Sequence, residues 1–190
     1  DICLNKADIF KVHGVYMASD TTTAAVAPTM TYSSASGSNI TTSEIFQPGE
    51  KITGSNGAIA RIITGGTSGS TTATTSFSYL TTKTFTVGTT LTSSQNTFSY
   101  ALTITAVTAG DENILSNYTF DSGMRDTYYD LGSLSKKSGS APPTGKLLIV
   151  FDYFTHGAGN YFSVDSYPVG TSVTSITYDE IPLYSAQRVD

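Results

Sequence analysis

Three side chains near the C-terminal end are of the types that bind metals or transfer protons. Asp152, His156 and Asp165 lie within the stretch FDYFTHGAGNYFSVDSYP, residues 151–168. One imidazole and two carboxylates are a reasonable ligand set for a divalent metal. The same stretch contains six aromatic residues, which could instead pair across a β-hairpin and fill a small core. The spacing must therefore be judged from the strands that would carry these side chains.

Two apolar runs, KLLIVFDYF (146–154) and YFSVDSYPV (161–169), flank a glycine-containing break and predict a hairpin. Alternate residues of a strand face opposite sides, so Asp152 points away from its two aromatic neighbours. A loop over 156–160 places Phe151 opposite Asp165, and a slip of one residue would bring the two aspartates together. Since no further ligands lie nearby, the sequence favours an aromatic hairpin without a metal or cofactor.

Other catalytic signatures are missing from the chain. The sequence has no Gly-x-Ser-x-Gly elbow with suitable partners, no His-Glu-x-x-His, no Cys-x-x-Cys and no phosphate-binding loop. The adjacent pairs Asp111–Glu112 and Asp179–Glu180 point apart in a strand and are more typical of solvated turns. We therefore predict no catalytic residues and a protein that is not an enzyme.

The composition indicates an all-β fold. Thr and Ser make up nearly a third of the 190 residues, charged residues only 13%, and aromatic residues 11%. Thr, Tyr, Phe, Val and Ile suit the half-buried surface of a sheet, and the aromatic content is too high for a disordered Ser/Thr tail. We expect two small β modules, residues 1–110 and 111–190, the first a sandwich or barrel and the second rich in hairpins with one short helical turn.

The charge pattern limits the partners. The formal net charge is -5, and the ten Lys and Arg residues are scattered instead of forming the basic patch that nucleic acid requires. No apolar run approaches the length of a membrane span. Cys3 is the lone cysteine, so an intramolecular disulfide is excluded. Because the chain opens on Asp1, we expect a processed product or a piece of a longer protein.

The first module contains a possible duplication. A turn, a strand and a second strand are expected over 45–64, and a similar series over 84–107. The two series align at a spacing of 39 residues, which pairs Phe46 with Phe85, Gly49 with Gly88, Ile52 with Leu91 and Thr53 with Thr92. Further strands are expected over 8–17, 29–34 and 76–80. We interpret the repeat as a duplicated hairpin within one small sheet or barrel.

Three glycines of the first series are predicted to form turns. Gly49 follows Pro48, a position where a type II turn requires positive φ, and Gly54 and Gly57 bracket the next turn in the same way. A phosphate-binding loop also uses glycines, but it requires a following helix N-terminus. Since a β-rich run follows here, the sequence favours turns.

The second module begins with a charged stretch. Asp121 or Ser122 could cap one helical turn reaching Tyr129. Arg125 would then contact Asp121, Tyr128 and Tyr129, which lie three or four residues away. The apolar run 146–154, the aromatic hairpin and a last strand ending at Pro182 complete the expected module.

Two segments carry a resemblance to a known family. FDSGMRDTYYD and PTGKLLIVFDYFTHGAGNYFSVDSYP are similar to segments of virion structural proteins of contractile-tailed, T-even-related cyanobacterial phages. The earlier FQPGEKITGSNGAIARI resembles a module of phage tail and fibre proteins, from which the second copy departs at Thr89 and Ser93. The shared motif, with the two hairpin aspartates, maps onto Asp121, Gly123, Arg125, Asp126, Tyr129, Asp130, Asp152 and Asp165.

The resemblance implies a tail, baseplate or tail-fibre component in the virion, acting by assembly with other subunits and as a homo-oligomer. It brings no catalytic residues, and it implies that the motif's charged residues tie the predicted turn to the aromatic hairpin. The alternative is a receptor-binding module that recognises a cell-surface glycan through stacked tyrosine rings. The tyrosines considered for that role, which could equally be core residues, are Tyr128, Tyr129, Tyr153 and Tyr161.

Overall fold

The computed structural model of the chain describes residues 1–32, 36–38, 46–65, 73–93, 99–125, 128–155, 167 and 169. Within these ranges the chain forms thirteen strands and a single 3-10 turn, η1 (Leu115–Asn117). The predicted all-β fold class is therefore confirmed. The abundance of Thr and aromatic residues explains this fold class, because their side chains pack well on the pleated, half-buried surface of a sheet.

The chain divides into two compact units, each assembled from separate stretches. Unit 1 contains Asp1–Val12, Asn117–Ser140 and the described residues from Phe151 onward, and unit 2 contains His13–Ser116 and Ala141–Val150. The sequence predicted two consecutive modules with a boundary at residue 110 instead. Local patterns in a sequence do not reveal that distant stretches share a unit, because pairing between distant strands leaves no local signal.

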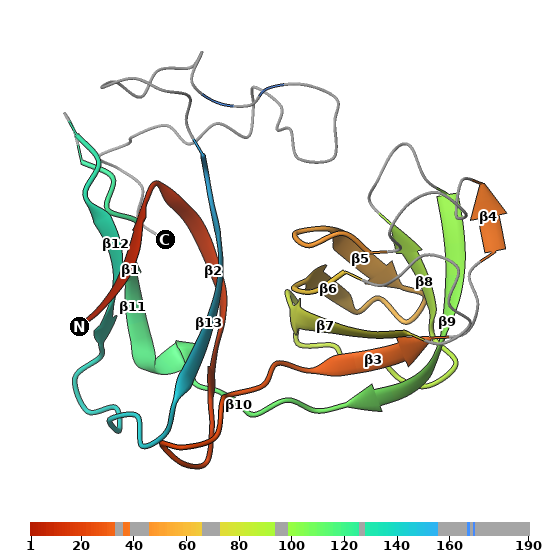
Figure 1. Ribbon diagram of the computed structural model, residues 1–190, viewed down its shortest axis with the longest axis horizontal. Coiled ribbons are helices and arrows are strands. Elements are labelled where there is room, and N and C mark those ends of the chain that lie inside the picture. Colours follow the sequence, from red (N-terminus) through yellow and green to blue (C-terminus); the bar gives the residue numbers. More distant parts are fainter. Residues whose placement is uncertain are drawn as a thin grey trace. The chain divides into compact units, whose positions relative to one another are not determined.

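A closed barrel forms most of unit 2 (Figure 1). Neighbouring strands are antiparallel in the order β3-β7-β6-β5-β8-β9, and β3 also pairs with β9, which closes the barrel. Closure leaves these six strands without a free edge along the ring. The short β4 (Ser36–Ser38) pairs with β9 outside the ring. The barrel strands are β3 (Thr29–Tyr32), β5 (Lys51–Gly54), β6 (Ile59–Ile62), β7 (Ala73–Tyr79), β8 (Thr90–Ser93) and β9 (Ser99–Thr108).

The duplicated hairpin is present in the barrel, and its two copies have the same hydrogen bonds. Gly49 donates its N–H to the carbonyl of Ile62, and Gly88 donates to the carbonyl of Ile104, each at 2.8 Å. Both glycines have positive φ, 85° and 86°. The first strands of the two copies, β5 and β8, pair antiparallel with Thr53 opposite Thr92. An approximate twofold axis therefore passes between two residues that the sequence repeat makes equivalent.

The third strand of each copy extends this symmetry. Ile62 of the first copy lies opposite Phe77 of β7, whereas Ile104 of the second copy lies opposite Tyr32 of β3. β3 thus takes the place in the second copy that β7 takes in the first, although β3 precedes both copies in the chain. The duplication is therefore circularly permuted, which a search for consecutive repeats does not detect.

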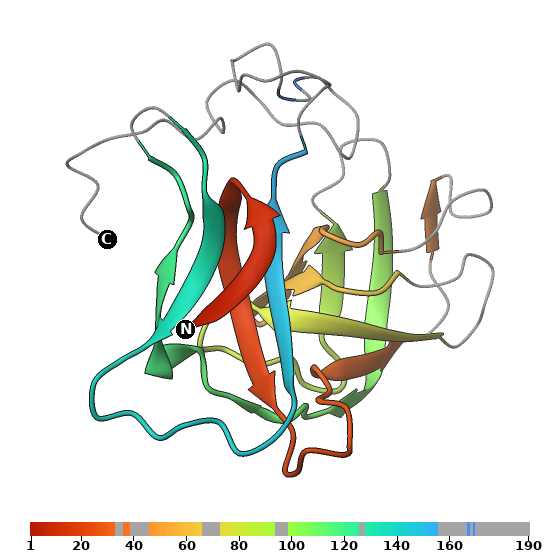
Figure 2. The same cartoon turned by 60° about the vertical axis from the view of Figure 1, so that its left-hand side comes forward.

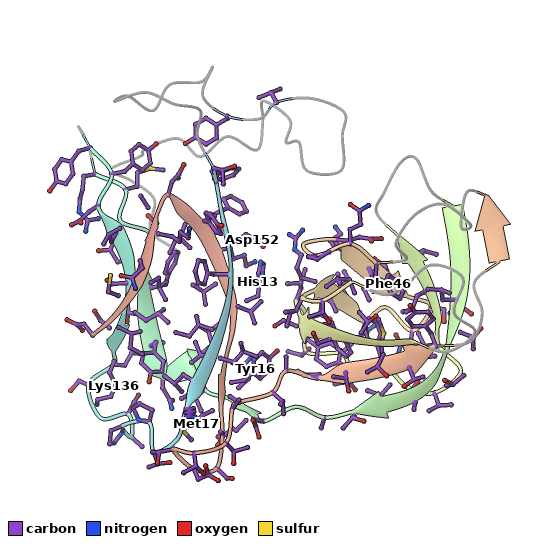
Figure 3. All side chains as sticks on the ribbon, viewed as in Figure 1. His13, Tyr16, Met17, Phe46, Lys136 and Asp152 are labelled. Atoms are coloured by element: carbon purple, nitrogen blue, oxygen red, sulfur yellow. The ribbon has the colours of Figure 1, made fainter. Side chains whose placement is uncertain are left out.

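The barrel interior is filled by large side chains that follow the same symmetry. The ring of Tyr32 contacts Phe46 edge-on at 5.1 Å between centroids, and the ring of Phe77 contacts Phe85 at 5.3 Å. All four side chains are buried, and Phe46 is labelled within the barrel in Figure 3. Such edge-to-face contacts add roughly 0.5–1.5 kcal/mol each to the burial energy. These four rings are part of the cluster of buried side chains that forms the core of the barrel.

Unit 1 contains a three-stranded antiparallel sheet of order β1-β12-β11. Its strands are β1 (Ile2–Ala7), β12 (Leu131–Lys136) and β11 (Tyr118–Asp121). The register of β1 shifts between Cys3 and Ala7, and both Asn5 and Asp8 have positive φ. The shift bends β1 into the tight turn that leads to β2.

A third sheet has the order β10-β2-β13, with β10 (Glu112–Asn113), β2 (Ile9–Met17) and β13 (Leu147–Tyr153). Figure 1 and Figure 2 both show β2 and β13 side by side. The apolar run at 146–154 therefore forms a strand, as predicted. Its expected hairpin partner over 161–169 and the last strand before Pro182 lie outside the described residues, except for Tyr167 and Val169.

The helical turn predicted from Asp121 to Tyr129 is wrong. β11 extends through Asp121, and Met124 and Tyr129 form an antiparallel bridge, so the described part of this segment is a β-hairpin connection between β11 and β12. Asp121 does accept a main-chain N–H, as a helix cap would, but it does so in a hairpin connection. Its carboxylate accepts the N–H of Gly123 at 2.9 Å, which closes a turn and starts no helix.

Candidate functional site

Arg125 and Asp121 form a two-point contact at the start of the segment FDSGMRDTYYD. Both guanidinium nitrogens donate to the Asp121 carboxylate, at 2.9 and 2.8 Å. The Arg125 guanidinium holds the pKa of that carboxyl below its usual value, against the opposing effect of burial. Both side chains are partly exposed. The predicted contact between these residues is present, but it spans a hairpin loop instead of a helical turn.

Gly123 is the residue that makes this loop possible. Its φ is 80°, and a Cβ placed on it would lie 2.2 Å from the main-chain oxygen of Asp130. Only glycine fits, because any side chain would collide with the returning strand. Its own carbonyl accepts the N–H of Asp130 at 2.7 Å, and Arg125 N–H donates to the carbonyl of Tyr128 at 2.9 Å. The loop is therefore held by its main chain as well as by the ion pair.

The adjacent tyrosines of the motif point in different directions. Tyr128 is 60% exposed. Tyr129 is half-buried, and its hydroxyl lies 3.3 Å from the hydroxyl of Tyr167. Tyr167 in turn donates to the Asp8 carboxylate at 2.7 Å. The three side chains form a hydrogen-bonded chain, named here the Asp8 cluster, that joins the β1–β2 turn and the loop between β11 and β12 to Tyr167.

Asp8 is the centre of this cluster. It is 1% exposed, it has a φ of 53°, and its main-chain carbonyl accepts the N–H of Phe154 at 3.1 Å. A buried carboxylate requires strong partners, and the Tyr167 hydroxyl is one of them. Burial raises the pKa of Tyr167, and the hydrogen bonds with Tyr129 and Asp8 raise it further. Tyr167 therefore keeps the proton that it donates.

Aromatic rings surround the cluster. Phe154 contacts the ring of Phe10 at 5.6 Å and the ring of Tyr167 at 5.1 Å, both edge-on. This arrangement answers part of the question raised by the sequence, because described rings of the 151–168 stretch pack on one another. Phe154 and Tyr167 pack on each other here, whereas the predicted pairing of 146–154 with 161–169 lies outside the described residues.

Two further tyrosines bear on the glycan alternative. Tyr153 is 42% exposed, and the Lys6 ammonium lies 4.8 Å above its ring, a cation–π geometry. Phe151, on the same face of β13, has its ring centroid 6.0 Å from that of Tyr153. Tyr128 and Tyr153 thus present exposed rings, whereas Tyr129 is engaged in the Asp8 cluster. Tyr161 lies outside the described residues.

The grouping of Asp152, His156 and Asp165 that the sequence raised as an alternative cannot be followed in the structure. Asp152 is half-buried on β13 and is labelled in Figure 3. His156, Asp165 and the motif residue Asp126 lie outside the described residues. In the part of the chain that is described, no three His, Cys, Asp or Glu side chains gather closely enough to hold a metal ion. The same part includes no helix with the length and apolar character to cross a bilayer.

The turn glycines behave in two ways. Gly49 and Gly57 have positive φ, 85° and 81°. Gly54 does not, and it lies at the end of β5 because of space: a Cβ there would approach Thr89 to 2.8 Å and Phe85 to 3.0 Å. The prediction that Gly54 acts like Gly57 is therefore wrong in its reason, although both glycines close the same turn through a 2.8 Å hydrogen bond.

Sequence reasoning missed Asp8 and Tyr167. Asp8 separates two apolar strands, but the sequence predicts one strand over 8–17 that includes it, because its positive φ has no local sequence signature beyond the Asp itself.

Comparison of the chain with family models, with curated proteins and with solved structures found no match in any of the three.

Proposed function

We propose that this chain is a structural component of a phage virion, in the tail, baseplate or tail fibre, and that it acts by assembling with other subunits. The observation that carries the proposal is the arrangement of the shared motif. Asp121, Gly123, Arg125 and Asp130 bind one another and the main chain of their own loop. The hydrogen-bonding groups of these residues fix the shape of the loop, as expected of a structural protein.

Exposed apolar side chains of unit 1 support the same proposal. Tyr128, Leu131, Phe10 and Tyr153 are between 42% and 60% exposed. Large apolar residues at a surface are what a subunit interface buries, and aromatic residues are enriched at such interfaces. The low charge content of the chain points in the same direction.

The test is to locate the chain in particles. We expect mass spectrometry of purified phage particles to detect it at a fixed copy number, with cross-links to other virion proteins and to itself. Immunogold labelling would then place it on the tail. Finding the chain only in the lysate of infected cells, and never in particles, would refute the proposal.

The second candidate function is recognition of a cell-surface glycan, which Lys6 and Tyr153 favour. An exposed ring beside an ammonium can stack on a sugar and bind an anionic group. We expect Tyr153→Ala to abolish any signal on a glycan array, and Phe46→Leu, a barrel-core change, to leave it intact. If the unsubstituted protein and Phe46→Leu both bind no glycan on the array, glycan recognition is refuted and assembly remains the proposed function.

A further inference from the structure

The turn between β5 and β6 contains the only Asn-Gly pair of the sequence, Asn56-Gly57. Asparagine is a thermolabile residue, and it is most labile before glycine, because glycine has no side chain to shield its main-chain nitrogen. Both residues are exposed to solvent. The pair is therefore a candidate for a covalent change that needs no enzyme.

The reaction is deamidation through a cyclic imide. The main-chain nitrogen of Gly57 loses its proton to base and forms a bond with Cγ of Asn56, and the bond from Cγ to Nδ2 breaks, so that ammonia leaves. Water then opens the ring at either carbonyl, which gives aspartate or isoaspartate. The net exchange is one water for one ammonia, without an oxidant, a reductant or a cofactor.

In the folded barrel, each group that must move in this reaction is held by a hydrogen bond. The attacking nitrogen, the N–H of Gly57, donates to the carbonyl of Gly54 at 2.8 Å. Oδ1 of Asn56 accepts the N–H of Ala58 at 3.1 Å, and Nδ2 of Asn56 donates to the carbonyl of Thr84 at 2.9 Å. The side-chain amide is thus fixed on both sides of the carbon that would be attacked.

The geometry of the turn also opposes the product. Gly57 has a φ of 81°, and Gly54 donates its N–H to the carbonyl of Ala58, as in a three-residue hairpin loop with a left-handed glycine. Isoaspartate would add one carbon to the main chain of this loop, whose length fixes the register of β5 on β6. The closed turn therefore does not accommodate the isoaspartate product.

We propose that Asn56 is a site of spontaneous deamidation that is blocked in the closed barrel and reacts only when the β5–β6 turn opens. Turns open locally at a lower free energy than the core of a domain. The bond to Thr84 ties this turn to the connection between β7 and β8, so opening also separates two parts of the barrel. Deamidation then marks each chain that has opened, and the inference does not depend on the virion role.

A comparison of folded and unfolded chains tests the site. The full chain is incubated at mildly alkaline pH in buffer and in urea, and mass spectrometry follows the peptide that contains Asn56. We expect this peptide to deamidate at least about tenfold more slowly in buffer, because the reaction must wait for local opening. Asn113 and Asn117, which precede the bulky Ile114 and Tyr118, are internal controls and should stay intact in both.

A matched pair of substitutions tests the hydrogen bonds of the amide. A Cβ at Gly54 would lie 2.9 Å from Oδ1 of Asn56, so Gly54→Ala displaces the amide from its partners. A Cβ at Gly88, in the second copy, would meet nothing within 4 Å, so Gly88→Ala strains the barrel without touching Asn56. At temperatures equally far below their melting midpoints, we expect Gly54→Ala to deamidate several-fold faster than Gly88→Ala.

Each outcome decides the inference. An Asn56 that stays intact in urea would overturn the site itself, and equal rates in buffer and in urea would overturn its protection by the fold. A folded Gly54→Ala that reacts no faster than Gly88→Ala would show that the contacts of the amide do not control the reaction. If Gly54→Ala does not fold, the comparison of the unsubstituted chain in buffer and in urea decides alone.

Discussion

Asp8 is a single residue that binds two other stretches of unit 1. Its carboxylate and its carbonyl bind two different stretches that lie more than 140 residues further along the chain, at Phe154 and Tyr167. A hydrogen bond to a buried charged group contributes more than a neutral one, about 1.5–3 kcal/mol. Asp8 therefore holds Phe154 and Tyr167 to the β1–β2 turn.

Alkaline pH tests this contact at the residue scale. Because the folded protein raises the pKa of Tyr167, the contribution of this residue to stability is complete below its unfolded pKa of about 10. It is lost as the pH rises further, because the unfolded chain releases a proton that the folded chain keeps. We expect Tyr167→Phe to lower the free energy of unfolding at pH 8 by about 1–3 kcal/mol.

The difference between the two proteins should shrink between pH 10 and pH 11, by at most about 1.4 kcal/mol for one pH unit. Urea unfolding at several pH values measures this. Tyr128→Phe changes an exposed phenol and is the matched control, which should follow the unsubstituted protein throughout. A constant difference between Tyr167→Phe and the unsubstituted protein would show that Tyr167 has no special proton affinity.

The energetic equivalence of the two hairpin copies can be tested at the glycines of their turns. Gly49 and Gly88 have nearly equal φ, and a Cβ on either would meet nothing within 4 Å. Substitution by Ala should therefore cost only the left-handed conformation, about 1–2 kcal/mol, and equally at both sites. Gly54→Ala should cost more than either, because its Cβ would collide with Thr89 and Phe85.

Chemical denaturation of the three variants gives the comparison directly. The equality is the sharper part of the prediction, because it depends on the two turns being equivalent and not on the absolute cost. Clearly unequal losses in Gly49→Ala and Gly88→Ala would show that the two copies have diverged in their energetics. A Gly54→Ala variant as stable as the others would show that the barrel end can yield.

At the scale of elements, the sequence predicted what local patterns encode. The repeat of Phe46 and Gly49 at Phe85 and Gly88 revealed the duplicated hairpin, and the apolar run before Phe154 revealed β13. The Asp121–Arg125 contact was also predicted, with the wrong local structure, because an aspartate that accepts main-chain N–H groups starts hairpin turns as well as helices. The pairing of β1 with β12 was missed, since nothing local links residues more than 120 positions apart.

For the whole molecule, the important fact is that the division between units passes through strands. Val12 ends a stretch of unit 1 within β2, and Val150 ends a stretch of unit 2 within β13. β2 and β13 each contain residues of both units, so unfolding of one unit removes part of a strand that also belongs to the other. We therefore expect the two units to unfold together, although each has buried residues of its own.

Leu91→Ala in the barrel core and Leu134→Ala on β12 test this coupling, because both side chains are fully buried. Each should lower the free energy of unfolding by about 2–5 kcal/mol. Differential scanning calorimetry should show one transition in both variants, moved to lower temperature. A second transition that stays at the temperature of the unsubstituted protein would mean that the units melt separately.

The circularly permuted barrel also sets the order in which a newly made chain can become stable. β3 is among the first strands to be synthesised, yet one of its two neighbours, β9, comes last of the six, and Tyr32 must wait for Ile104. A nascent chain therefore leaves the ribosome with β3 and β8 each unpartnered along one side. The barrel cannot close until β9, which ends at Thr108, has emerged from the ribosome.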